Sequence, residues 1–349
     1  MKMASIVNEY YDVFRRKYGT SILAGQLKAL HAITDCRTPG SGEVLVKCTD
    51  CHHYQWHPLS CGHRNCPQCQ NIEATKWIDR QHDKLLPVLY FMVTFTLPYQ
   101  FRPLTYRHQR QVYSIFFACV SSTLKDFGLN PKNLGAEMAM TMVLHTHNRR
   151  LDFHPHLHAV VPGGGVDKKR RQWKKKKGKY LFNKKNIAKV FRARFIDALN
   201  KACLPIPKGV TSQWVVDCTR SSKGINALKY LSRYLYRGVI SEKNIVSNKD
   251  GQVTYRYIES KTRKTLYRTM AGEDFLQLIV QHVLPKGFRR VRDYGFLNGR
   301  AKKLLFIVQL ILHVKNKKVE PRQRPAFKCP ACESAMTVIG FRFKARGFG

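Results

Sequence analysis

The stretch FHPHLHAVVPGGG, residues 153–165, places histidines at positions 154, 156 and 158 between apolar residues and stops at three glycines. Side chains two residues apart on a strand share one face, so the imidazoles face one way while the apolar residues face the other. The apolar face can pack on helices, so the imidazoles on the opposite face should point into a cleft. Two of these imidazoles, two residues apart, can chelate one divalent ion.

A second strand pattern precedes this one and supplies candidates for a third ligand. Residues 138–147, MAMTMVLHTH, are followed at 148–150 by polar residues typical of a hairpin turn. A turn at that place brings His145 within about one residue pair of the histidine strand. We expect His145 to be the third ligand, with Asp152 as the alternative. The competing interpretation is that the strand is half-exposed and its polar positions happen to be histidines that bind no metal.

The charge of the chain points to a polyanionic partner. Its 349 residues include 62 Lys and Arg against 22 Asp and Glu, a formal charge of +40. A compact protein this basic repels itself unless a partner neutralises it. The basic residues alternate with Tyr, Phe and Leu throughout the chain, which favours a nucleic acid over a membrane surface.

Neither end of the chain has the apolar run of a targeting or membrane segment. Residues 1–19 have the pattern of an amphipathic helix, and the apolar segment 304–314 is too short to span a bilayer. We therefore expect a cytoplasmic protein without membrane contact. Its eleven cysteines should stay reduced there, so cysteine clusters are better explained by metal than by disulfides.

Strand and helix patterns both occur along the chain and predict an α+β fold. Helical patterns cover most of residues 1–35 and recur later, and strand patterns lie between them. Further helices are expected near 110–128, 184–202, 222–236 and 273–283, and strands at 88–96, 138–147, 153–162 and 212–218, with a hairpin at 251–272.

The first cysteine pairs have almost the spacing of a four-thiolate zinc site. Cys48, Cys51, Cys66 and Cys69 form two CxxC pairs separated by fourteen residues. A closed shell of four thiolates leaves no position for substrate, so this zinc should be structural. Buried cysteines without metal are the alternative interpretation.

Other cysteines and histidines leave a second zinc site open. Further residues close to the first pairs in sequence can replace a ligand or build another site, namely Cys36, Cys61, His63, His52, His53 and His57. Cys329 and Cys332 form a third CxxC, followed by neither Cys nor His. This pair either borrows ligands from elsewhere in the fold or is a half-site without metal, and we slightly favour the half-site.

The segment LKYLSRYLYRGVI, residues 228–240, supplies candidate nucleophiles. On a helix its leucines form one stripe, while Tyr230 and Tyr234 lie off that stripe beside Arg233 and Arg237. Aromatic residues at helical spacing usually belong to a core, but core tyrosines rarely neighbour two guanidinium groups. We expect these tyrosines to face a charged ligand. Tyr236 points in a third direction, and its role stays open.

Together these residues are suited to strand transfer on DNA. A tyrosine hydroxyl has a pKa near 10, but a bound cation and nearby arginines can stabilise the phenolate and the charge that develops on phosphorus. Attack on a phosphodiester gives a phosphotyrosine and a free hydroxyl without consuming water, so the bond energy is kept for rejoining. Two tyrosines one helical turn apart permit two successive transfers.

These motifs resemble the HUH endonucleases and, among them, the two-tyrosine rolling-circle transposases of bacterial insertion sequence ninety-one. Nearly the whole chain is similar to that family. The segments that carry the resemblance are the cysteine-rich residues 36–70, VTFTLPYQFR at 93–102, FHPHLHAVVPGGG at 153–165, KYLSRYLYR at 229–237 and HVLPKGFRRVRDYGFL at 282–297.

The resemblance implies a site and a reaction. His156 and His158 correspond to the paired ligands of Mg²⁺ or Mn²⁺, and Tyr230 and Tyr234 correspond to the nucleophiles. It also implies single-stranded DNA as substrate, a covalent 5′-phosphotyrosine intermediate, and a central antiparallel sheet flanked by helices. A third tyrosine at 236 departs from the family pattern, which leaves the division of labour among the tyrosines open.

We expect a zinc-binding module over residues 1–75, an HUH core over 76–270 and a basic helical region over 271–349. The protein should bind the single-stranded ends of a mobile element in the nucleoid, and a homo-oligomer is a candidate assembly. Two other functions stay open: a replication initiator or relaxase with the same chemistry, and a non-catalytic zinc-dependent DNA-binding regulator. The basic residues expected to contact DNA are Arg233, Arg237, Lys174, Lys175, Arg289 and Arg290.

Overall fold

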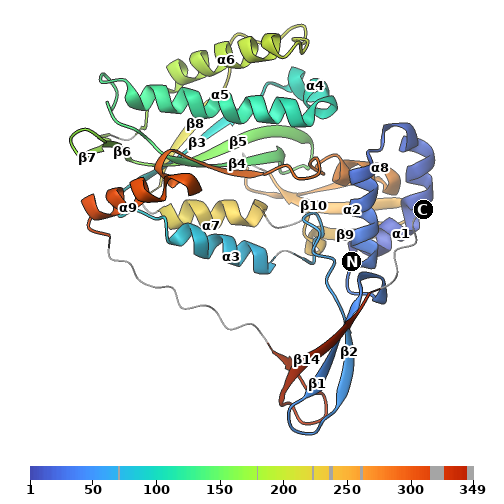
Figure 1. Ribbon diagram of the computed structural model, residues 1–349. Coiled ribbons are helices and arrows are strands. Elements are labelled where there is room, and N and C mark those ends of the chain that lie inside the picture. Colours follow the sequence, from blue (N-terminus) through green and yellow to red (C-terminus); the bar gives the residue numbers. More distant parts are fainter. Residues whose placement is uncertain are drawn as a thin grey trace. The chain divides into compact units, whose positions relative to one another are not determined.

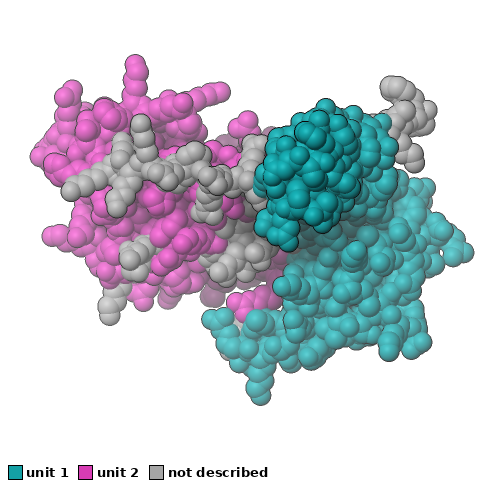
Figure 2. All heavy atoms as spheres, turned by 90° about the horizontal axis from the view of Figure 1, so that it is seen from below, with its two compact units in different colours: residues 1–72, 236–283, 318–349 teal, residues 73–235, 284–317 magenta. Residues whose placement is uncertain are grey.

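The computed structural model describes residues 1–69, 71–178, 180–221, 224–235, 239–259, 262–314 and 326–343, without the side chains of 71–72 and 230–235. The chain forms two compact units, coloured separately in Figure 2. Unit 1 comprises residues 1–72, 236–283 and 318–349, and unit 2 comprises residues 73–235 and 284–317. Both units are assembled from segments far apart in sequence. The functional division at residues 75 and 270 stays a prediction.

Unit 2 is built on an antiparallel sheet with the strand order β12-β4-β5-β3-β8. The consecutive strands β4 and β5 pair as the hairpin expected around residues 148–150. The α+β fold with an antiparallel sheet is thereby confirmed. The strands are β3 (Tyr90–Thr96), β4 (Met140–His147), β5 (Phe153–Pro162), β8 (Val216–Ser221) and β12 (Val291–Tyr294).

Helices cover both faces of this sheet (Figure 1). The helices α5 and α6 lie on one face, and α3 and α7 lie on the other. None of the helices in the described part of the chain is long and apolar enough to cross a membrane. The helices of unit 2 are α3 (Asn71–His82), α4 (Arg102–Arg107), α5 (Gln109–Leu129), α6 (Lys184–Lys201), α7 (Gly224–Leu235) and α9 (Lys302–Ile311).

The core of unit 2 lies between the sheet and helices α5 and α6. Alternate residues of β4 and β5, such as Leu144 and Leu157, face this core and are fully buried. Phe191 of α6 is at its centre, and its ring contacts Phe95 of β3 and Phe116 of α5 at centroid distances of 5.1 and 5.6 Å. The apolar face predicted for the histidine strand is therefore the core face of the sheet.

The three glycines at 163–165 are required by close backbone packing after β5. A Cβ atom at any of the three would lie between 2.5 and 2.7 Å from a backbone oxygen of a neighbouring segment. The chain continues into the short hairpin of β6 (Gly164–Asp167) and β7 (Gln172–Lys175). A side chain at these positions would separate the backbones that make these contacts.

Unit 1 contains the helices α1 (Met3–Tyr18), α2 (Ala24–Asp35) and α8 (Gly272–Val280). They pack against one another, and α8 also packs on a sheet of β9 (Ile245–Lys249), β10 (Gln252–Ile258) and β11 (Thr265–Ala271). Hydrogen bonds join segments that are distant in sequence: the Tyr10 hydroxyl donates to Asn248 Oδ1 at 2.7 Å, and the Tyr18 hydroxyl donates to Asp274 Oδ1 at 2.5 Å.

A second sheet of unit 1 has the order β13-β14-β1-β2. It pairs β1 (Glu43–Cys48) with β2 (Tyr54–Pro58) and with β14 (Ala335–Arg342), which in turn pairs with β13 (Phe327–Lys328). The region 271–349, expected to be helical, therefore carries α8 and α9 but ends its described part in strands. These strands depend on pairing with β1, a contact that local sequence periodicity does not reveal.

We predict that Phe191→Ala lowers the free energy of unfolding by about 3–5 kcal/mol, because it removes a fully buried ring and leaves a cavity. Phe306→Ala is the matched control, since that side chain is 55% exposed on α9 of the same unit. It should change stability by no more than about 0.5 kcal/mol. Chemical denaturation of both variants measures the difference, and equal losses would contradict this core.

Candidate functional site

The pairing of β4 with β5 brings three histidines together on one face of the sheet. His145 lies opposite His156, and His158 lies opposite Val143. Ring nitrogens of the three histidines lie within 4.8 Å of one another, and their ring centroids are between 4.5 and 5.1 Å apart. The structure thus brings together the three histidines expected from the sequence. Asp152, the alternative, accepts a hydrogen bond from Asn148 Nδ2 at 3.1 Å outside this cluster.

Hydrogen bonds fix the orientation of two of these rings. His156 Nδ1 donates to the carbonyl oxygen of His154 at 2.8 Å, which leaves the Nε2 lone pair of His156 for a metal. His158 Nδ1 is 2.9 Å from Thr94 Oγ1, on the strand that pairs with β5 from the other side. Thr94 is a contributor to the site that the sequence pattern did not identify.

Burial keeps the three imidazoles neutral. Burial lowers the pKa of His156 to about 4 and that of His158 to about 3. The pKa of His145 also falls well below its ordinary value, first because of burial and then because of the charges of His158 and His156. Since a metal binds the neutral imidazole, these rings are ready to act as ligands at neutral pH.

The histidine cluster fits a divalent ion. Three imidazole nitrogens on one side of an ion leave its remaining coordination positions for oxygen ligands. The hydrogen bond from His156 to a backbone carbonyl is the outer contact typical of metal-ligating histidine.

Helix α7, which carries the tyrosine motif, packs on β3, β4, β5 and β8. Leu228 of this helix shares a small cavity with Thr141 and Val160, which lie on the sheet face of the histidines. The backbone at positions 230, 233 and 234 is helical and belongs to α7. The side chains of Tyr230, Arg233 and Tyr234 lie outside the description, as do residues Ser222, Tyr236, Arg237 and Gly238 entirely.

The basic residues expected to contact DNA differ in their surroundings. The carbonyl oxygen of Arg290 accepts a hydrogen bond from Leu144 N of β4 at 2.9 Å. The positive charge of Arg290 also lowers the pKa of His145, with a smaller effect than burial and the neighbouring histidines. Arg289 and Lys175 are exposed. Lys174 instead donates to Gly135 O at 2.9 Å and pairs with Asp167 at 3.2 Å.

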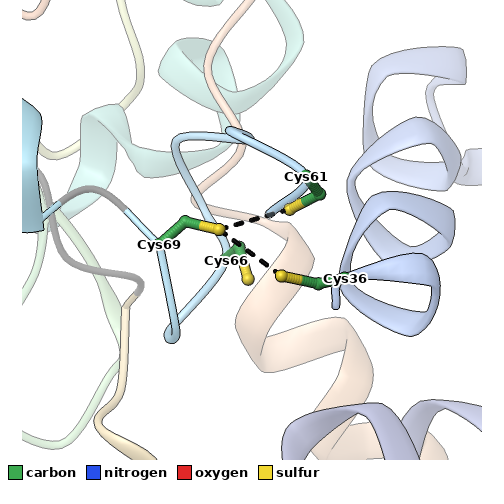
Figure 3. Close-up of side chains that lie close together, drawn as sticks. All are labelled: Cys36, Cys61, Cys66 and Cys69. Carbon is green, nitrogen blue, oxygen red and sulfur yellow. Dashed lines mark hydrogen bonds between the residues drawn. The ribbon is translucent and has the colours of Figure 1, made fainter. Parts of the chain in front are cut away.

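A cluster of thiols in unit 1 joins Cys36, at the end of α2, to a loop that carries Cys61, Cys66 and Cys69. Figure 3 shows the four side chains pointing toward one another. Cys69 Sγ lies 3.4 Å from Cys36 Sγ and 3.6 Å from Cys61 Sγ. Burial raises the pKa of the Cys36 thiol to about 12. The cluster fits a zinc ion, which would displace the thiol protons.

The other CxxC pairs form a separate cluster of Cys48, Cys51, Cys329 and Cys332. The expected single site of Cys48, Cys51, Cys66 and Cys69 is therefore wrong in its grouping. Spacing along the chain made these pairs obvious partners, but β1 ends at Cys48 and brings this residue and the turn with Cys51 to the strands β13 and β14. Cys36 and Cys61, which were candidates for another site, complete the cluster of Cys66 and Cys69 without His63. The sequence did contain a signal for this second cluster, because the CxxC of Cys329 and Cys332 has no other Cys or His near it in sequence.

Two family models match the chain. Residues 139–304 match a family described as "Putative transposase", and residues 6–97 match a transposase zinc-binding domain of the insertion sequence ninety-one type. The first match includes the histidine cluster and α7. The second includes the cluster of Cys36, Cys61, Cys66 and Cys69.

Relatives are similar over most of the chain. A protein described as "Putative transposase y4qJ" from Sinorhizobium fredii (strain NBRC 101917 / NGR234) is 32% identical over 329 residues, covering 86% of this chain and 81% of the relative. The transposase for insertion sequence element IS801 from Pseudomonas savastanoi pv. phaseolicola is 26% identical over 273 residues, covering 72% of this chain and 64% of that protein. No solved structure matches. The chain belongs to the transposase family of insertion sequence ninety-one.

Proposed function

We propose that this transposase cleaves and rejoins single-stranded DNA at the ends of its element through Tyr230 and Tyr234, in a rolling-circle reaction of the HUH type. The observation that carries this proposal is the cluster of His145, His156 and His158 on the sheet face covered by the tyrosine helix. The family match supports DNA as the partner. Single-stranded ends as the substrate follow from the resemblance of the motifs.

The path of α7 supports the placement of the tyrosines. A Cβ atom at Gly224, where the helix begins, would lie 2.6 Å from the ring of Tyr90 on β3, and Leu228 reaches Val160 on β5 and Thr141 on β4. Tyr90 lies opposite Pro162 of β5, so the helix advances from the level of Pro162 to that of Val160. Positions 230 and 234 lie about 3 and 9 Å further along the helix axis.

The histidines of β5 follow beyond Val160 in this same direction, toward the N-terminal end of the strand. His158 and His156 lie about 7 and 13 Å beyond Val160 along β5. A helix that keeps its course therefore carries positions 230 and 234 toward the histidine cluster. Their spacing of four residues puts positions 230 and 234 on one face of a helix, so that each tyrosine can serve in turn.

The proposed step conserves the phosphodiester energy. The tyrosine oxygen attacks phosphorus, its proton leaves, and an O–P bond forms as the bond from phosphorus to the 3′ oxygen breaks. The products are a 5′-phosphotyrosine and a strand with a free 3′ hydroxyl, which accepts a proton. Attack by a 3′ hydroxyl on the phosphotyrosine reverses these changes and rejoins DNA.

His145, His156 and His158 would hold the divalent ion. Such an ion polarises the phosphate oxygens and stabilises the charge that develops on them. Of the two ions that the resemblance implies, Mn²⁺ suits imidazole ligands better than Mg²⁺, which prefers oxygen ligands in a strict octahedron. The chain itself contributes neutral, oriented imidazoles and the positive charge of Arg290 near the phosphate.

Other parts of the proposal concern binding and assembly. Arg233, Arg237, Lys175 and Arg289 would contact phosphates, and structural zinc would occupy the cluster of Cys36, Cys61, Cys66 and Cys69. Lys174 would contribute less than its neighbour, because its ammonium group already has partners within the protein. Such a DNA-bound protein would reside at the nucleoid of a bacterial cytoplasm, and a homo-oligomer could hold both ends.

We predict that Tyr230→Phe combined with Tyr234→Phe reduces covalent protein–DNA product by at least about 100-fold, because both nucleophilic oxygens are absent. The assay uses labelled single-stranded DNA from the element ends with Mn²⁺, followed by denaturing electrophoresis. Binding of the DNA should remain and should weaken with added salt.

The matched control for this assay is Tyr99→Phe with Tyr180→Phe. These exposed tyrosines lie in the same unit outside the histidine cluster, so the control should form adduct at the wild-type level. Adduct that persists in the double variant of Tyr230 and Tyr234 would refute the assignment of the nucleophiles.

We predict that the protein without added divalent ions loses stability as the pH falls from 6.5 toward 4. Burial lowers the pKa of His156 from 6.5 to about 4, so at pH 5 the unfolded chain binds a proton that the folded chain does not. The stability present above pH 6.5 should decrease by about 2 kcal/mol at pH 5 for this one group.

Chemical denaturation of the full chain at pH 7.5 and pH 5 tests this dependence. His156→Gln removes the titrating ring while keeping a neutral polar side chain, so this variant should lose about 2 kcal/mol less than wild type on acidification. The same loss in both proteins would show that His156 is not buried in its neutral form.

A further inference from the structure

We propose that Cys48, Cys51, Cys329 and Cys332 form a second structural zinc site, which joins the C-terminal strands of the chain to β1 and β2. This site is additional to the cluster of Cys36, Cys61, Cys66 and Cys69. The matched zinc-binding domain covers residues 6–97 and therefore includes only half of its ligands.

The positions of the sulfur atoms fit a tetrahedral ion. Cys48 Sγ lies 3.4 Å from Cys332 Sγ, and Cys51 Sγ lies 3.5 Å from both Cys329 Sγ and Cys332 Sγ. All four atoms lie within 4.8 Å of one another. A tetrahedron with Zn–S bonds of about 2.3 Å separates its sulfurs by roughly 3.8 Å, so small shifts would close the shell.

Both CxxC segments have the same backbone geometry. Cys48 N donates to His53 O at 2.8 Å, and Cys329 N donates to Ser334 O at 2.9 Å, in each case five residues further on. The residue after the second cysteine has a positive φ in both segments, 57° at His52 and 60° at Glu333. Two matching turns, each presenting two thiols to the other, are typical of a four-thiolate zinc site.

Hydrogen bonds between the two turns hold them in this arrangement. Thr49 N donates to Ala335 O at 3.2 Å, and the Ser334 hydroxyl donates to Asp50 Oδ2 at 2.5 Å. The register of β1 with β14 continues the contact by placing Cys48 opposite Met336. The turns are therefore positioned by the sheet as well as by their thiols.

The apolar core beneath this sheet is too small to stabilise it alone. Among the described residues, its buried members are Val44, Val46, Cys48, Cys329 and Met336, and two of these are proposed ligands. Small modules with so little buried apolar surface depend on a metal or a disulfide. The four thiols favour zinc over disulfides, because all four sulfurs surround one common centre instead of lying in two pairs at the S–S bond length of about 2.05 Å.

The proposal can be tested by measuring the zinc content of the purified full-length protein by elemental analysis. Wild type should contain about two zinc ions per chain, and Cys329→Ser with Cys332→Ser should contain about one. Cys203→Ser, at an exposed cysteine outside both clusters, is the control and should keep about two. Equal zinc content in wild type and the double variant would overturn the proposal.

Alkylation of wild type gives a second test that does not depend on folding of a variant. Cys51, Cys332 and Cys203 are all exposed, so accessibility alone predicts similar reactivity. In zinc-loaded protein Cys51 and Cys332 should react with N-ethylmaleimide at least about 10-fold more slowly than Cys203, and a chelator should remove this protection. Equal rates before chelation would overturn the site. Neither test involves DNA, so failure here would leave the proposed strand transfer intact.

Discussion

The antiparallel register of β4 and β5 is the constraint on which the rest of unit 2 depends. Because side chains alternate along a strand, this register sends Leu144 and Leu157 into the core while it sends His145 and His156 to the opposite face. A slip of one residue would turn the histidines toward α5 and α6 and the leucines toward α7. The cohesion of the core and the geometry of the histidine cluster are therefore set by the same hydrogen bonds.

The two units rely on different sources of stability. Unit 2 surrounds its sheet with large aromatic side chains such as Phe116 and Phe191, and helices cover both faces. The sheet of β1, β2, β13 and β14 buries few apolar residues and gathers thiols at its turns. Metal coordination suits such a segment, because a few strong bonds replace the contacts that a larger core would provide.

Local pattern in the sequence was enough to predict the histidine hairpin, the helix of the tyrosine motif and the α+β class. Period-two alternation defines the faces of β5 without knowledge of its neighbours, and the turn at 148–150 places His145. Partner choice among the cysteines was not predictable in this way. Each CxxC looks alike in sequence, and only the pairing of β1 with β14 distinguishes Cys329 from Cys66 as the partner of Cys51.

The pairing of β1 with β14 also sets a delay during synthesis on the ribosome. Cys51 and Cys329 are 278 residues apart, so translation at roughly 5–20 residues per second makes them about 14–56 s apart. Throughout that interval Cys66 and Cys69 are the nearest CxxC pair available to Cys48 and Cys51. An ion captured by these four thiols would hold the nascent chain in a mispaired state, and release of that ion would then limit the rate of maturation.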